Sequence, residues 1–144
     1  MRTALIALAL LGLAGLALAG ETPEQKKAER VAEVTREIKK AEASVARWTP
    51  EAIEAKRKSG ATAAMMGSVE RGLAKAKADL PALKLELSWL QGEITLTTAE
   101  VAVKAAQDAL DKADEKGKPE AQAKLDAAKS TLEAVRKLED AKEF

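Results

Sequence analysis

The chain has 144 residues, with 24 basic and 23 acidic side chains, and it contains no cysteine, histidine or tyrosine. The absence of cysteine excludes disulfide bonds, and the absence of both cysteine and histidine removes the side chains on which most nucleophilic triads and transition-metal sites depend. The near-zero net charge excludes the basic surplus that nucleic-acid-binding surfaces need. We therefore expect no cofactor, no nucleic-acid partner and no enzymatic activity.

Residues 1–19 have the pattern of a secretory signal peptide. Arg2 precedes an apolar run that closes on the small residues Ala17 and Ala19. An uncleaved membrane anchor is the alternative, but the run is shorter than the roughly 20 residues that cross a bilayer comfortably. We expect cleavage after Ala19, which predicts a periplasmic or extracellular helical domain of residues 20–144. Without cysteine, this domain cannot carry a lipid on its first residue.

The first helical hairpin is expected over residues about 23–94. Its first helix begins at Thr22-Pro23-Glu24-Gln25, because Thr22 can cap the free backbone donors and Pro23 suits the first turn. The apolar residues that follow alternate in steps of three and four, as in the seam of a coiled coil. These residues are Val31, Val34, Ile38, Ala41, Val45 and Trp48.

A second start signal, Thr49-Pro50-Glu51, predicts a short helix or a kinked continuation. Gly60 is expected to end it, because glycine readily takes the left-handed conformation that closes a helix. A longer seam then starts near Thr62. Its residues are Met66, Val69, Leu73, Ala76, Leu80, Leu83, Leu87, Leu90 and Ile94. A fold-back at Gly60 places Trp48 opposite Gly72 and Trp89 opposite Val31.

The second hairpin is expected over residues 96–142, with its turn in the stretch ADEKGKPEAQ. Gly117 is predicted to stop one helix, and Pro119 is predicted to start the next. Folding there brings alanine layers and leucine or valine layers into alternation. The facing pairs are Ala113 with Ala121, Leu110 with Leu125, Ala106 with Ala128, Val103 with Leu132, and Ala99 with Val135.

The connection between the hairpins leaves two architectures open. Ile94 and Leu96 belong to different seams, yet they are separated by about 200° on a continuous helix. A straight helix would give an elongated coiled coil with one hairpin on each side. A break after Gly92, with a new capping box at Thr97 and Glu100, would allow a four-helix bundle. We favour the bundle within this all-α class, because it buries both seams in one core.

Few residues suggest a binding site. Trp48, Trp89 and Phe144 are possible interaction residues, although tryptophans at seam positions usually belong to the core. Four acidic residues gather around the predicted turn, namely Asp111, Asp114, Glu115 and Glu120. They lack the alternate spacing of a calcium loop, so we interpret them as solvated charges and predict no metal site.

The chain is alanine-rich and helical, and it offers no catalytic constellation. We expect a secreted or periplasmic, non-enzymatic scaffold or adaptor that acts through coiled-coil interactions, with a protein partner or with itself. One alternative is a small chaperone or carrier that shields apolar cargo. Another is an amphipathic lipid-surface binder, for which Lys56, Arg57 and Lys58 are few.

Overall fold

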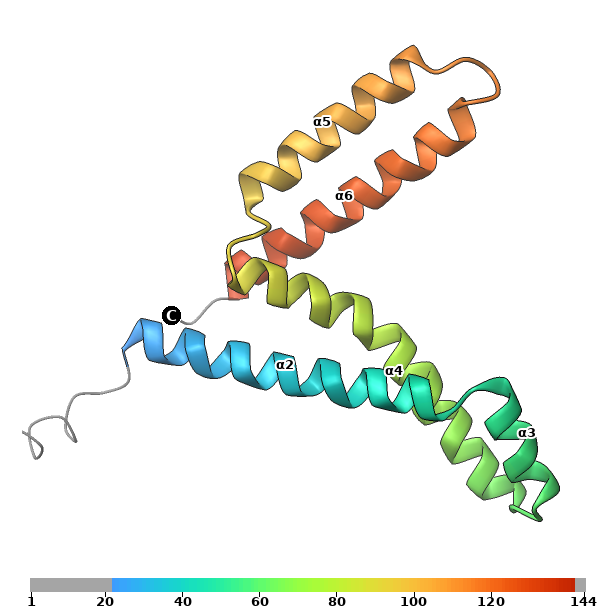
Figure 1. Cartoon of the computed structure of the whole chain (residues 1–144). Helices are drawn as coiled ribbons and strands as arrows, with labels where there is room; N and C mark the ends of the chain where they lie inside the picture. The colour runs from blue at the N-terminus through green and yellow to red at the C-terminus, as the bar shows by residue number, and fades with distance from the viewer. Residues whose placement is uncertain (1–21, 142–144) are drawn as a thin grey trace, which may run out of the picture.

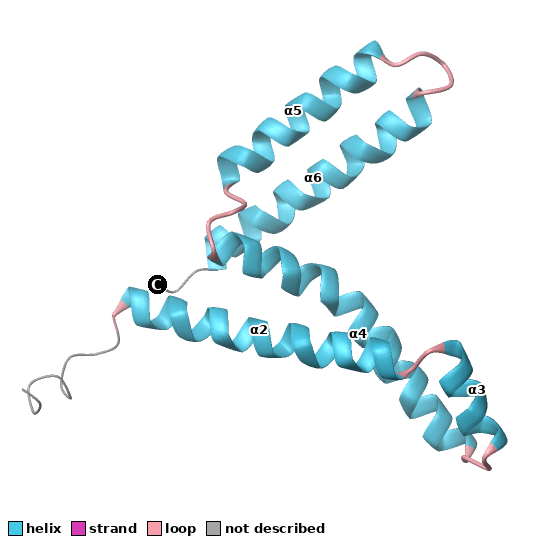
Figure 2. Cartoon of the chain, in the orientation of Figure 1, coloured by secondary structure: helices cyan, strands magenta, loops and turns pink. Residues whose placement is uncertain are grey.

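The computed structural model describes residues 22–141, and within this range all regular secondary structure is helical. The helices are α2 (Pro23–Arg47), α3 (Pro50–Lys58), α4 (Ala63–Leu90), α5 (Leu96–Lys112) and α6 (Lys118–Ala141) (Figures 1 and 2). The predicted all-α class is confirmed. The expected signal peptide, residues 1–19, and Phe144 lie outside the described residues.

Helices α2 to α5 each begin after a threonine whose side chain caps the first turn. Thr22 Oγ1 accepts a hydrogen bond from the Gln25 backbone at 3.2 Å, and the Gln25 side chain accepts one from the Thr22 backbone at 2.8 Å. This is the predicted capping box, in which two free backbone donors are satisfied reciprocally. Thr49 and Thr62 cap α3 and α4 in a simpler way, with one side-chain acceptor each.

The chain breaks between α4 and α5 over residues 91–95. Gly92 has a φ of +78°, and the Glu93 backbone N–H donates to the Ser88 carbonyl at 2.9 Å. This turn ends α4 and leaves Thr95 in an extended conformation. Thr95 is the N-cap of α5 and forms a capping box with Thr98. The prediction of a capping box at Thr97 and Glu100 is therefore wrong. The turn is shorter than expected, so the N-cap lies two residues earlier, at Thr95.

Helices α2 and α4 pack as the first hairpin. Val34, Ile38 and Leu90 form its most buried cluster. The side chains packed around this cluster are Val31, Leu80, Leu83, Leu87 and Trp89. Two interhelical ion pairs cross this hairpin, Arg30 with Glu86 and Lys84 with Glu42, each at 2.7 Å.

The predicted packing of Trp48 against Gly72 is wrong. A Cβ atom placed on Gly72 would meet open space among the described residues. Trp48 is the C-cap of α2, where the backbone leaves the helix with φ −105° and ψ 63°. The start signal at Thr49 and Pro50 turns the chain away at that point. The half-buried Trp48 ring instead lies under the Arg47 guanidinium, 5.2 Å from its centroid.

The short helix α3 forms the tip of the first hairpin, at the end remote from α5 and α6 (Figure 1). The structure describes every residue of α3, and none of them is fully buried. Gly60, one residue after the C-cap Ser59, has a φ of +85° and reverses the chain into α4. Arg57 links this tip to α4 through an exposed ion pair with Glu70 at 3.1 Å.

Helices α5 and α6 form the second hairpin. Its buried residues come from both helices and are Ala99, Ala121, Leu125 and Val135. An ion pair between Arg136 and Glu100 at 3.3 Å crosses the hairpin beside the predicted Ala99–Val135 layer. Small side chains such as those of Ala99 and Ala121 generally allow two helix axes to approach closely.

The turn of the second hairpin differs from the prediction. Helix α5 already ends at Lys112, and Asp114 organises the turn by accepting the Gly117 N–H through its side chain at 2.8 Å. Gly117 has no positive φ, and its carbonyl accepts the first bond of α6, from Ala121. Gly117 therefore lies directly before α6 instead of stopping α5, and Pro119 lies in the first turn of α6.

The two hairpins meet where α4 contacts α6, and this contact is smaller than the packing inside either hairpin. From this junction the hairpins extend in different directions (Figure 1). The end of α6 lies near the beginning of α2, because Lys26 and Ala141 line the same hollow. The junction is therefore the place where side chains from three helices converge.

Candidate functional site

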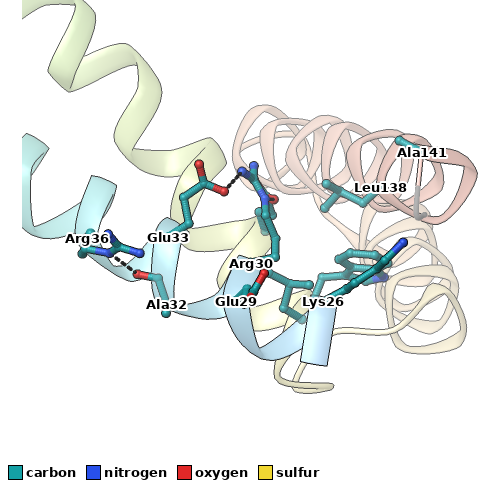
Figure 3. Close-up of a pocket in the computed structure, with 11 residues that line it drawn as sticks. Lys26, Glu29, Arg30, Ala32, Glu33, Arg36, Leu138 and Ala141 are labelled. Carbon is teal, nitrogen blue, oxygen red and sulfur yellow. Dashed lines mark hydrogen bonds and ion pairs between the residues drawn. The ribbon is translucent and has the colours of Figure 1, made fainter. Parts of the chain in front are cut away.

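A groove of about 850 Å³ lies at the junction of α2, α4 and α6. We call it the junction groove, and Figure 3 shows α2 on one side of it and α6 on the other. Its α2 wall is mostly charged and consists of Lys26, Glu29, Arg30, Ala32, Glu33 and Arg36. The remaining lining residues come from α4 and α6 and are Glu86, Trp89, Leu90, Leu138 and Ala141.

Arg30 is the centre of the charged wall. Its Nε donates to Glu86 Oε1 and its Nη1 donates to Glu33 Oε2, each at 2.7 Å. The hydrogen bond that Arg30 donates to Glu86, followed by the one that it donates to Glu33, raises the pKa of Arg30 above its usual value, although partial burial opposes the shift. Arg30 thus stays charged and ties α2 to the last turns of α4. The Glu86 side chain is only 16 % exposed, so the pair is partly shielded from water.

Apart from Glu86, the α4 and α6 residues that line the groove are largely apolar. Leu90 is 2 % exposed, and Leu138 and Trp89 are half-buried. The Trp89 Nε1 donates a hydrogen bond to Glu139 Oε1 at 2.9 Å, which links the end of α4 to α6. The indole N–H of Trp89 is therefore bound to α6, while its ring lines the groove. Tryptophan suits such a position because it combines a large apolar ring with one polar N–H group.

The titratable groups that line the groove are lysine, arginine and glutamate side chains, and Arg30 forms ion pairs with two carboxylates. Among residues 22–141, no group of three or more metal-ligating side chains is arranged to hold an ion. An apolar wall facing a charged wall suits the two faces of an amphipathic helix.

The structure places the residues singled out in the sequence at different points. Of the three possible interaction residues, Trp89 lines the junction groove, Trp48 lies at the end of α2, and Phe144 lies outside the described residues. The turn residues Gly60 and Gly117 lie at the two hairpin tips, which Figure 1 shows far from the junction.

Sequence reasoning missed Arg30, Glu86 and Leu138 as groove residues. The three residues come from three different helices, so no local spacing could bring them together. The one available signal was Trp89, which lies one residue away from its seam and thus pointed to a second environment.

The basic residues considered for lipid contact are largely engaged within the protein. Arg57 contacts Glu54 and Glu70 at 3.3 and 3.1 Å, and Lys58 contacts Glu54 at 3.8 Å. These ion pairs reduce the charge that α3 can offer to a membrane surface. In the part of the chain that the structure describes, every helix is too short or too polar to cross a membrane.

Comparison with known proteins adds no further constraint on this site. No protein-family model matches the chain, and neither a curated protein nor a solved structure matches it.

Proposed function

We propose that the protein is a secreted or periplasmic, non-enzymatic helical adaptor that binds an amphipathic helix of a partner protein in the junction groove. The observation that carries this proposal is the groove itself, where apolar and charged walls face each other at the meeting point of three helices. Helix-in-groove recognition needs such a pair of walls, because the partner helix buries one stripe and leaves the other polar.

The arrangement of two helical hairpins that extend in different directions from one junction supports an adaptor role (Figure 1). The cores are confined to the hairpins, with Val34 and Leu90 in one and Leu125 and Val135 in the other. Each hairpin therefore presents a long polar surface, while the groove lies at the junction. Such a molecule can hold one partner at the junction and keep its two tips apart. The expected signal peptide of residues 1–19 provides the route to the periplasm or exterior.

Photo-crosslinking from single positions tests the partner site. A photoreactive phenylalanine analogue is placed at Leu138, which lines the groove, in cells that express the whole chain. The expected result is a discrete crosslinked product with a second protein. Mass spectrometry should identify the crosslinked peptide of the partner. We expect this peptide to come from an amphipathic helix, because the groove is proposed to bind one.

Val101 provides the matched control position. It is 62 % exposed and does not line the groove, so the analogue there samples general surface contact. Crosslinking of equal yield from positions 101 and 138 would show that the groove has no special role. A product formed only with a second copy of the chain would replace the adaptor by a self-associating scaffold.

A carrier of apolar small molecules is the second candidate. The groove volume of about 850 Å³ falls within the range of roughly 300–1,000 Å³ that small-molecule sites occupy. An environment-sensitive apolar dye should then gain fluorescence with the parent protein and lose that gain with Leu138→Glu. Equal fluorescence with both proteins would remove this candidate and leave the adaptor standing.

The secretion expectation is tested separately. Expression of the whole chain in a bacterium should yield a processed protein whose first residue is Gly20 in the periplasm or medium. The intact mass of the purified product decides this. A product that retains residues 1–19 and sediments with membranes would show that the segment is an anchor.

A further inference from the structure

The groove side of α2 carries four charged residues in a regular order. Lys26, Glu29, Glu33 and Arg36 all line the junction groove, and they follow one another in steps of three, four and three positions. At about 100° per residue, these steps keep the four residues within a sector of about 80° around the helix. We call them the charge row, and it presents the charges +, −, − and + over about 15 Å of helix axis.

Most of this charge is not used within the described part of the protein. All four residues are exposed, and Lys26, Glu29 and Arg36 form no ion pair with another described residue. Arg36 donates to the carbonyl of Ala32, one turn earlier on its own helix, at 3.3 Å (Figure 3). Glu33 is 55 % exposed, although one of its oxygens joins an ion pair within α2. The charge row is therefore accessible to charges on another molecule.

We propose that the partner helix carries the complementary row, acid-x-x-base-x-x-x-base-x-x-acid, along one flank of its apolar stripe. This inference names the chemistry of the partner and rests on the proposed function. Trp89 and Leu138 contact the apolar stripe, while the charge row contacts the flank. The charge row has the same order of signs in both directions, so a partner helix that runs either way along α2 matches it.

The sequence argues against a second copy of the chain as this occupant. Two α2 helices packed antiparallel about residue 31 would place Lys26 beside Arg36 and Glu29 beside Glu33, and such like charges repel each other. The complementary order of acids and bases occurs nowhere in the 144 residues. The occupant is therefore a helix of a different protein.

Two designed peptides test the charge selection. Both are amphipathic helices of about 18 residues with leucine along the apolar stripe, and both have the same net charge. The matched peptide carries glutamate, lysine, lysine and glutamate at the spacing of the complementary row, and the inverted peptide exchanges glutamate and lysine. Fluorescence anisotropy with protein purified from cells that express the whole chain measures both dissociation constants. The matched peptide should bind about tenfold more tightly at low salt, because ion pairs replace contacts between like charges.

Inversion of the charge row provides the corresponding variant. Lys26→Glu, Glu29→Lys, Glu33→Lys and Arg36→Glu together leave the net charge of the protein unchanged. The combined variant should reverse the preference, so that the inverted peptide binds about tenfold more tightly than the matched one.

A second pair of substitutions is the control. Lys39→Glu with Asp108→Lys exchanges charges at exposed positions that do not line the groove, so it should keep the preference of the parent protein. Circular dichroism should show equal helix content for all variants. Added salt should narrow the preference of the parent, because the Debye length falls from about 10 Å at 0.1 M to about 3 Å at 1 M.

The parent protein alone already decides the charge selection. Equal affinity for the two peptides, or no binding of either, would overturn it, as would a preference that inversion of the charge row leaves in place. A parent that sediments as a dimer and dissociates when the row is inverted would overturn it in favour of a second copy.

The outcomes for the charge selection and for the proposed function are distinct. A crosslink from position 138 without any peptide preference would refute the charge selection alone. A peptide preference that reverses with the charge row, but with no crosslink from position 138, would refute the proposed function alone.

Discussion

At the scale of single residues, the junction depends on a few partly shielded polar contacts. Arg30 joins Glu86 across the first hairpin, while its second partner, Glu33, is on its own helix. The two carboxylates differ in environment, since Glu86 is 16 % and Glu33 is 55 % exposed. Interactions shielded from water contribute more than exposed ones, so these two contacts should be unequal.

We expect Glu86→Ala to destabilise the protein by about 1 kcal/mol, because it removes a charge-assisted hydrogen bond and leaves Arg30 partly buried with one partner fewer. Glu33→Ala should have an effect of about 0.3 kcal/mol or less, as is usual for an exposed pair within one helix. Urea unfolding of both variants measures the difference. Equal losses in the free energy of unfolding would show that the burial of Glu86 does not strengthen its contact with Arg30.

A second residue-scale prediction concerns acid. Hydrogen bonds from Lys124 and Lys137 lower the pKa values of Glu120 and Glu133 on α6. A carboxylate whose folded pKa is lowered stabilises the fold above the unfolded pKa of about 4.3, and this contribution is lost as the pH falls through the folded value. Helix content should therefore decrease on acidification below about pH 4.

The matched variant is the double substitution Glu120→Gln and Glu133→Gln. It lacks both titrating groups, so circular dichroism should show a smaller acid-induced loss of helix than in the parent. Superimposable acid profiles would mean that these two lysine contacts do not stabilise α6 in solution.

At the scale of elements, the helices are separated by turns with distinct local chemistry. Threonine caps begin α2 to α5, and left-handed glycines end α3 and α4. The α5–α6 turn uses neither device, since Asp114 organises it through the Gly117 N–H. Each boundary is therefore fixed by one or two residues, and its stability can be probed separately from the packing.

Gly92 and Gly72 form a matched pair for such a probe. Gly92→Ala should destabilise the protein by about 1 kcal/mol or more, because its φ of +78° is strained for a residue with a Cβ. Gly72→Ala should stabilise it by about 0.5–1 kcal/mol, because Gly72 lies within α4 and the added Cβ enters open space. Thermal unfolding of both variants measures shifts of opposite sign. A shift of the unfolding temperature in the same direction for both variants would contradict the backbone conformation described at Gly92 or at Gly72.

At the scale of the whole molecule, the structure consists of two hairpins joined through a small contact. The main link is α4 against α6, with Trp89 bonded to Glu139. Most burial stays within each hairpin, so cooperativity between them should be weak. The hairpins are thus expected to behave as two folding units.

Leu125→Ala tests this independence. Leu125 is 2 % exposed in the second hairpin, so its truncation should destabilise that hairpin by about 2–3 kcal/mol. Hydrogen exchange should then increase across α5 and α6 while the amides of α2 keep their protection. Val101→Ala, at an exposed position of α5, serves as the control and should change little. A uniform increase through both hairpins would show a single cooperative unit.

The sequence predicted what local chemistry determines. The helix starts at Thr22 and Thr49 followed from capping residues next to a proline. The seam of the second hairpin placed Ala99 near Val135, and both are buried. The cap of α5 was misplaced, because three threonines stand within Thr95–Thr98 and the length of the preceding turn decides which of them is used.

The candidate site was beyond sequence reasoning for a physical reason. The junction groove depends on the direction in which the second hairpin leaves Gly92, and no seam encodes that direction. Arg30 and Leu138 are more than a hundred positions apart and belong to different hairpins. The failed placement of Trp48 on Gly72 has the same origin, since one backbone dihedral at a helix end redirects a whole side chain.

The position of the Asp114 turn has a consequence for the molecular dimensions. Because it lies at the far end of the second hairpin, matched insertions of seven residues in α5 and α6 would lengthen this arm by about 10 Å and keep its apolar register. The junction groove would be untouched. The length of the second hairpin can therefore change, through evolution or engineering, without changing the residues that line the junction groove.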